Sequence, residues 1–136
     1  DLAGLLSPSM FREFVMPQYH RVYEGASRIY MHSELLNVEH LRIIRDDLGF
    51  DEFHGAGTEK VTFAEMYEVL GHNFWVQLTP HELAHLSPNE IRERIKVLAN
   101  SRAMAVQLYP GRLTPPENME AALDACREEC PGGPRW

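Results

Sequence analysis

Four short apolar runs recur along the chain, and each ends in polar residues before a signal that starts a helix. The runs span 28–32, 51–54, 74–78 and 103–108, and they follow one another at intervals of roughly 25 residues. This rhythm is typical of parallel strands joined by crossover helices. Because parallel strands are buried on both faces, their side chains are mostly apolar and polar residues collect at their ends. The pattern predicts an α/β fold with a candidate site at the four strand ends.

Capping boxes mark the starts of several helices, since a hydroxyl side chain and a glutamate three residues later can each satisfy a backbone N–H. Three such boxes pair Thr62 with Glu65, Ser87 with Glu90 and Thr114 with Glu117. Gly25, Gly49 and Gly71 are expected to end helices. The predicted helices span 7–24, 37–48, 62–70, 87–99 and 114–129. The first contains Pro17, which should kink it or split it in two.

Length and charge limit the classes of protein that fit. With 136 residues, 44% of them hydrophobic, we expect one domain over 1–130 and a disordered tail over 131–136. A net charge of -7 argues against partners such as nucleic acid or an anionic membrane. No apolar run is long enough to span a bilayer, so a soluble, cytoplasmic protein is expected. Cys126 and Cys130 are expected to be reduced thiols.

Such a set of four strands is predicted to be half of a larger object. A curved sheet of this size would leave two open edges and an uncovered apolar inner face. The chain also begins at Asp1 without an initiator methionine, and its first element is a helix although the repeat is strand then helix. We therefore expect a partner, either another copy of the chain in a homodimer or an N-terminal half on another chain.

Four motifs in register resemble the C-terminal half of the uroporphyrinogen decarboxylase superfamily, which includes the corrinoid-dependent methyltransferases. They lie at 7–17 (SPSMFREFVMP), 32–34 (HSE), 77–80 (QLTP) with 87–91 (SPNEI), and 113–118 (LTPPEN). The resemblance runs from about Leu2 to Cys126. It implies a TIM-type (β/α)8 barrel, of which this chain would supply a partial (half) barrel of about four parallel βα units preceded by a helix.

The resemblance also implies a zinc site. In the methyltransferase branch, zinc is held by a His-x-Cys pair at one strand end and by a second Cys at a later one. Here His32-Ser33-Glu34 stands at the first place, and no second Cys lies in 107–111. Side chains two residues apart at a strand end point the same way, so His32 and Glu34 are the candidate zinc ligands. The implied function is zinc-assisted methyl transfer with a corrinoid protein as partner. Porphyrinogen decarboxylation is not expected, because 107–111 also lacks the histidine of the decarboxylases.

Three further residues are candidates for substrate binding. His54 closes the second strand and precedes Gly55-Ala-Gly57, where small residues let a ligand approach the backbone. Gln77 and Tyr109 fall at the ends of the third and fourth strands. Each has a structural alternative: His54 can belong to a flexible loop, Gln77 can bond a neighbouring loop, and Tyr109 can pack beneath one.

Two other functions stay open. His81-Glu82-Leu-Ala-His85 is an HExxH sequence, the pattern that zinc metalloproteases place in a long helix. Here Pro80 precedes it and Ser87-Pro88 starts a new helix directly after it, which favours a short connecting helix with surface histidines. The second alternative is a catalytically degenerate half-barrel that acts as a ligand- or partner-binding module.

Overall fold

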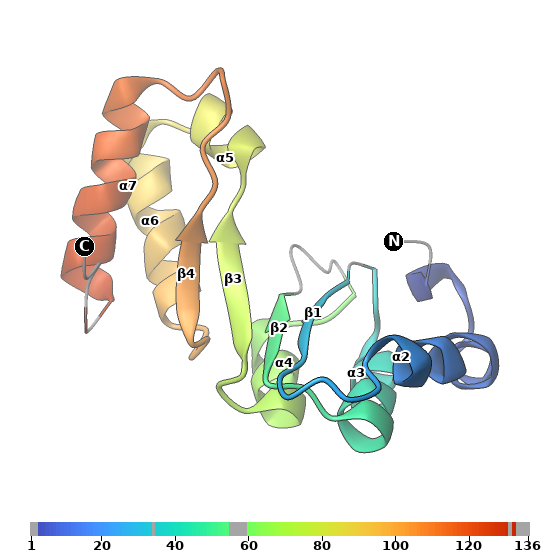
Figure 1. The fold of residues 1–136 in the computed structure, drawn as a ribbon. Coiled ribbons are helices and arrows are strands. Elements are labelled where there is room, and N and C mark those ends of the chain that lie inside the picture. The colour runs from blue at the N-terminus through green and yellow to red at the C-terminus, as the bar shows by residue number, and fades with distance from the viewer. Residues whose placement is uncertain (1–2, 34, 55–59, 131, 133–136) are drawn as a thin grey trace. The chain divides into compact units, whose positions relative to one another are not determined.

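The computed structural model describes residues 3–33, 35–54, 60–130 and 132, and within them the chain is an α/β protein. Four parallel strands form one sheet and alternate with helices along the chain (Figure 1). The strands are β1 (Tyr30–His32), β2 (Glu52–His54), β3 (Phe74–Leu78) and β4 (Ala105–Leu108), in the order β1-β2-β3-β4. The predicted parallel βα rhythm is therefore confirmed.

The chain divides into two compact units, Asp1–Trp75 and Val76–Trp136, with the boundary inside β3. The prediction of a single domain over 1–130 stays a prediction. In the part of the chain that the structure describes, none of the helices combines the length and the apolar composition needed to cross a bilayer.

The helix that contains Pro17 changes type along its length. It follows a 3-10 turn, η1 (Ala3–Leu5), and consists of α1 (Pro8–Met10), the π-helical η2 (Phe11–Val15) and α2 (Met16–Val22). The N–H of Met16 bonds the carbonyl of Phe11, five residues back, directly before Pro17. Proline lacks an N–H and its ring crowds the preceding turn, so a widened turn relieves both problems. The helix runs without a gap through Pro17, so the predicted split does not occur, and the π-helical stretch lies directly before the proline.

The remaining helices of the first unit begin directly after side chains that cap them. Asn37 precedes α3 (Val38–Ile43), which continues as the π-helical η3 (Ile44–Leu48), and Thr62 precedes α4 (Phe63–Leu70). The Thr62 box closes with Glu65, whose carboxylate accepts the backbone N–H of Thr62 at 2.8 Å. η3 and α4 end at Gly49 and Gly71, both with positive φ, a region that only glycine enters without strain.

The two faces of the first unit's sheet differ in character. Met31, Phe53 and Phe74 point to one side, and each is at most 2% exposed, so they form the core beneath this part of the sheet. Because side chains alternate along a strand, the intervening residues point to the opposite side. We call that side the polar face; it carries Tyr30, His32, Glu52, His54 and Trp75.

The second unit packs two long helices against each other. α6 (Pro88–Ala99) contacts α7 (Pro116–Glu129), and the short α5 (Pro80–His85) precedes them. Ile91, Ile95 and Leu98 are buried at helical spacing on α6. On α7, the buried positions 121, 122 and 125 are all alanine. Such small residues allow two helices to approach closely.

The capping box predicted at Thr114 is wrong. α7 begins at Pro116 with Pro115 as its N-cap, and no side chain caps it. A residue before proline avoids the helical region, so Pro115, which precedes Pro116, is extended with ψ 144°. Thr114 instead accepts the backbone N–H of Gly111 at 3.0 Å and closes the loop before the helix. The box predicted at Ser87 is confirmed.

Candidate functional site

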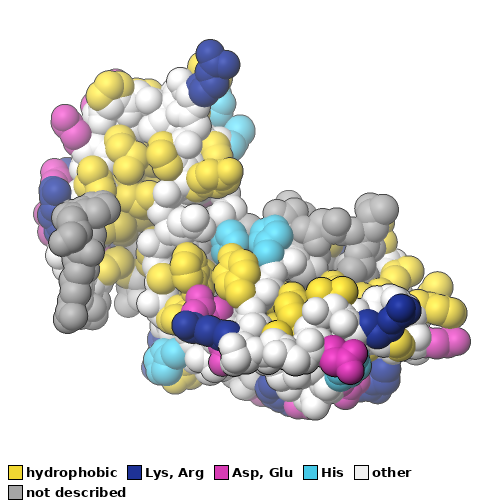
Figure 2. All heavy atoms as spheres, viewed as in Figure 1, with side chains coloured by type: hydrophobic (Ala, Val, Ile, Leu, Met, Phe, Trp, Pro, Cys, Tyr) yellow, Lys and Arg dark blue, Asp and Glu magenta, His cyan; other side chains and the backbone are white. Residues whose placement is uncertain are grey.

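The carboxyl ends of β1 and β2 bring two histidines together. His32 and His54 are register partners in neighbouring parallel strands, so their side chains project from the polar face side by side. Their Nδ1 atoms are 3.1 Å apart and their ring centroids 4.9 Å apart. His32 is exposed, whereas His54 is only 9% exposed. We call these two residues the histidine pair; Figure 2 shows adjoining histidine side chains next to hydrophobic ones in this region.

Aromatic side chains adjoin the histidine pair on the polar face. Trp75 is the register partner of His54, and its ring centroid lies 6.5 Å from that of His54. Tyr30 meets Trp75 edge to face at 6.1 Å and is 49% exposed. The indole N–H of Trp75 is buried, and no residue in the described part of the chain accepts its hydrogen bond. The pair therefore lies beside apolar surface, where an electrostatic interaction is stronger than in bulk water.

Of the residues predicted for the site, the structure brings His32 and His54 together. Glu34, the second predicted zinc ligand, and 55–57 lie outside the described residues. Gln77 is half-buried in β3, and Tyr109 follows β4, is 55% exposed and donates its backbone N–H to the Leu78 carbonyl at 3.1 Å. Both belong to the second unit, so their convergence with the histidine pair stays a prediction.

The glutamate of the HExxH sequence, Glu82, belongs to the capping box at the start of α5. One carboxylate oxygen of Glu82 accepts both the backbone N–H and the hydroxyl of Thr79 at 2.8 Å, and the other accepts Nε of Arg94 at 2.7 Å. Burial raises the pKa of Glu82, but the bonds from Thr79 and Arg94 outweigh it and the pKa is lowered. A general base must take up a proton from its substrate. The lowered pKa and the bonds to both oxygens make the Glu82 carboxylate a poor proton acceptor.

The HExxH histidines lie together at the surface. α5 has six residues, as the short connecting helix predicted from the sequence requires, and the exposed rings of His81 and His85 have centroids 4.6 Å apart. Among the described residues, no group of three or more histidine, cysteine, aspartate or glutamate side chains is placed to hold a metal ion. The arrangement therefore lacks the third ligand of a protease zinc site within that part of the chain.

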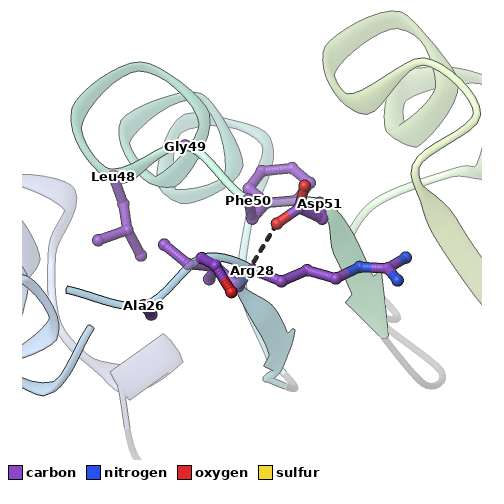
Figure 3. Close-up of a pocket in the computed structure, with 8 residues that line it drawn as sticks. Ala26, Arg28, Leu48, Gly49, Phe50 and Asp51 are labelled. Carbon is purple, nitrogen blue, oxygen red and sulfur yellow. Dashed lines mark hydrogen bonds between the residues drawn. The ribbon is translucent and has the colours of Figure 1, made fainter. Parts of the chain in front are cut away.

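A hollow of about 270 Å³ lies at the opposite ends of β1 and β2 from the histidine pair (Figure 3). Two of its polar side chains, Asp51 and Arg28, form bonds within the chain. Asp51 accepts the backbone N–H of Ile29 at 2.7 Å, and Arg28 forms an ion pair with Glu52. Ligand sites of parallel sheets lie at the carboxyl ends of the strands, so this hollow at the amino ends is not the candidate site.

Cys126 and Cys130 are free thiols at the end of α7, as predicted. Burial and the neighbouring Cys130 raise the pKa of Cys126 to about 11. Since the thiolate is the nucleophile and the metal ligand, Cys126 is unreactive at neutral pH.

The chain gives no significant match to any protein-family model, to any of the curated proteins or to any of the solved structures with which it was compared. The resemblance to the uroporphyrinogen decarboxylase superfamily therefore rests on the sequence motifs alone.

Proposed function

We propose that the chain is half of a TIM-type (β/α)8 barrel and part of a methyltransferase-like enzyme of the uroporphyrinogen decarboxylase superfamily. In this proposal a metal at the end of β1 assists methyl transfer from a corrinoid carried by a partner protein. The observation that carries it is the position of His32, an exposed imidazole at the carboxyl end of a parallel strand, beside a second histidine and two aromatic rings. That edge of a parallel sheet is where barrel enzymes place their catalytic groups.

The donor atoms at this edge suit zinc. Imidazole nitrogen is a common zinc ligand, and His32 is an exposed imidazole at the carboxyl end of its strand. Bound zinc would lower the pKa of a thiol acceptor so that it is present as thiolate at neutral pH. Tyr30 and Trp75 would limit water on one side of the acceptor, since both place ring surface on the same face.

The proposed activity can be measured with methylcobalamin as methyl donor and a small thiol as acceptor, in the presence of zinc. The thiolate sulfur would form a bond to the methyl carbon as the Co–C bond breaks, which leaves cob(I)alamin, and the thiol proton goes to water. We expect the methyl thioether by mass spectrometry and the loss of methylcobalamin by its absorbance. His32→Ala should slow the reaction by about tenfold or more, the loss expected when a metal site is disturbed. His85→Ala, in the exposed pair on α5, is the control and should react at the wild-type rate. Thioether formation no faster than without protein would overturn the proposal.

A partner-binding role has two specific observations in its favour. Tyr30 is 49% exposed on the polar face, and β1 and β4 are the two edges of the sheet. Exposed aromatic surface and unpaired strand edges are features that a partner chain covers. A degenerate half-barrel of this kind would bind its partner and show no methyl transfer.

We further propose that the partner that completes the fold is a second copy of the chain or an N-terminal half-barrel, in the cytoplasm, where the two free cysteines stay reduced. For the second copy, light scattering coupled to size-exclusion chromatography should give the mass of a dimer of the 15.6 kDa chain. A mass that stays at that of one chain when the protein is concentrated would exclude the homodimer and leave the separate N-terminal half as the partner.

A further inference from the structure

We infer that His32 and His54 together bind one divalent transition-metal cation through their Nδ1 atoms. The sequence predicts His32 and Glu34 as the metal ligands and His54 as a substrate-binding residue, whereas the structure assigns His54 to the metal. This inference deepens the proposed function and rests on it for its role in methyl transfer, but cation binding can be measured without any turnover.

The separation of the two Nδ1 atoms suits a shared cation. A zinc–nitrogen bond is about 2.0–2.1 Å long, so two imidazole nitrogens on one zinc lie about 3.4 Å apart at the tetrahedral angle and about 2.9 Å apart at a right angle. The observed 3.1 Å between the Nδ1 atoms of His32 and His54 falls between these values. A cation can therefore be held with little movement of either side chain.

Burial of one ring nitrogen indicates which nitrogen His54 presents to His32. His54 is 9% exposed and its Nε2 is buried, so Nδ1 is the atom that faces His32. Both residues lie in paired strands, and that pairing sets the direction of their side chains from the backbone. A site built on paired strands holds its ligands more rigidly than one built on loops.

The exposure of His32 leaves room for more ligands. Two imidazoles satisfy half of a tetrahedral zinc. Catalytic zinc sites use three protein ligands and keep the fourth position for water or substrate, and the described residues place no third His, Cys, Asp or Glu ligand beside this pair. Since His32 is exposed while His54 is buried, the cation would lie at the solvent side of the pair. Water or an acceptor group can then reach it from the polar face.

A competing state uses the same two atoms. Without a cation, one Nδ1–H can donate to the other Nδ1 across 3.1 Å, and the pair shares a single proton. A cation takes the place of that proton, because a histidine ligand must present a deprotonated nitrogen. The two states are distinguished by whether added metal binds at this pair.

Trp75 supplies a direct reading of binding at the histidine pair. Its ring lies 6.5 Å from that of His54, and the chain has one other tryptophan, Trp136. In the full chain with Trp136→Phe, we expect Co²⁺ to quench Trp75 fluorescence with saturation at one cation per chain. Zinc, which does not quench, should restore the fluorescence by competition.

The variants separate this pair from the histidines on α5. His32→Ala and His54→Ala should each raise the Co²⁺ dissociation constant by about tenfold or more. The double variant His81→Ala/His85→Ala should bind as the parent chain does. Should His54→Ala alter the fold, as judged by its far-UV circular dichroism, the exposed His32→Gln provides the same test without disturbing a buried side chain.

Two results would overturn the inference: unchanged quenching in the His32 and His54 variants, or quenching abolished by the α5 double variant. The outcome is independent of the proposed function. Cation binding that depends on the pair without methyl transfer would reject the methyltransferase proposal alone. Methyl transfer with zinc that is unaffected by His54→Ala would reject His54 as a ligand alone.

Discussion

Replacing Phe53 by alanine is expected to lower the free energy of unfolding by about 3–5 kcal/mol, the range measured for large aromatic side chains removed from a core. Phe53 is fully buried in β2, between Met31 and Phe74 on the same side of the sheet. Its ring cannot be replaced by water in such apolar surroundings, so the variant would keep a cavity. Natural domains have only about 5–15 kcal/mol of stability, so this is a large fraction of the total. Urea denaturation followed by far-UV circular dichroism measures the effect.

Phe14→Ala is the matched control for this prediction. Phe14 is 57% exposed in η2, so the same change of side chain removes little buried surface and should alter stability by less than about 0.5 kcal/mol. If Phe53→Ala does not fold, Phe53→Leu keeps most of the volume and should still be less stable than the wild type. Equal losses for the Phe53 and Phe14 variants would mean that Phe53 does not lie in the core described above.

The second large effect is expected at Asn118, where replacement by leucine should cost about 2–4 kcal/mol. Asn118 is 3% exposed in the first turn of α7, and its amide donates to the carbonyls of Leu83 at 2.9 Å and Leu86 at 2.8 Å. These carbonyls lie at the carboxyl end of α5, where no intrahelical N–H is available to them. Leucine has a similar volume but no donor, so both acceptors would lose their partner, at about 1–3 kcal/mol for each buried group.

Asn100→Leu provides the comparison for Asn118→Leu. The amide of Asn100 also donates to a backbone carbonyl, that of Lys96 at 2.9 Å, but the bond is at the surface and water can replace it. We expect a loss of less than about 1 kcal/mol for this variant. The two proteins can be compared by thermal unfolding, and hydrogen exchange should show α5 opening more often only in the Asn118 variant. Unchanged protection of α5 would contradict the role given to Asn118.

Local signals in the sequence predicted most of the element order. The hydroxyl–proline–x–glutamate pattern occurs three times, at 79–82, 87–90 and 114–117. The box at Ser87 forms as predicted, and the one at Thr114 fails because a second proline holds Pro115 in an extended conformation. The first occurrence overlaps the family motif at 77–80 and the HExxH sequence, and it obeys the same capping rule. The shared pattern assigns Glu82 to the cap of α5.

Contacts between distant parts of the chain could not be predicted in the same way. The bond from Arg94 to Glu82 and the bonds from Asn118 to α5 depend on how helices pack, and no local spacing encodes them. The histidine pair is an intermediate case. His32 and His54 each close a strand, and the sequence predicted that such ends converge, but their direct contact depends on the register of β1 with β2.

The order of strands in the sheet is also the order in which they are synthesised. Each strand therefore finds its neighbour one βα unit away, and no strand has to wait for a distant segment of the chain to emerge from the ribosome. Pairing with the strand one βα unit away closes a shorter loop than pairing with a more distant strand, and the entropic cost of closure rises with loop length. Growth of the sheet by one strand at a time from the N-terminal side would also limit how long any newly made edge is left without a neighbour.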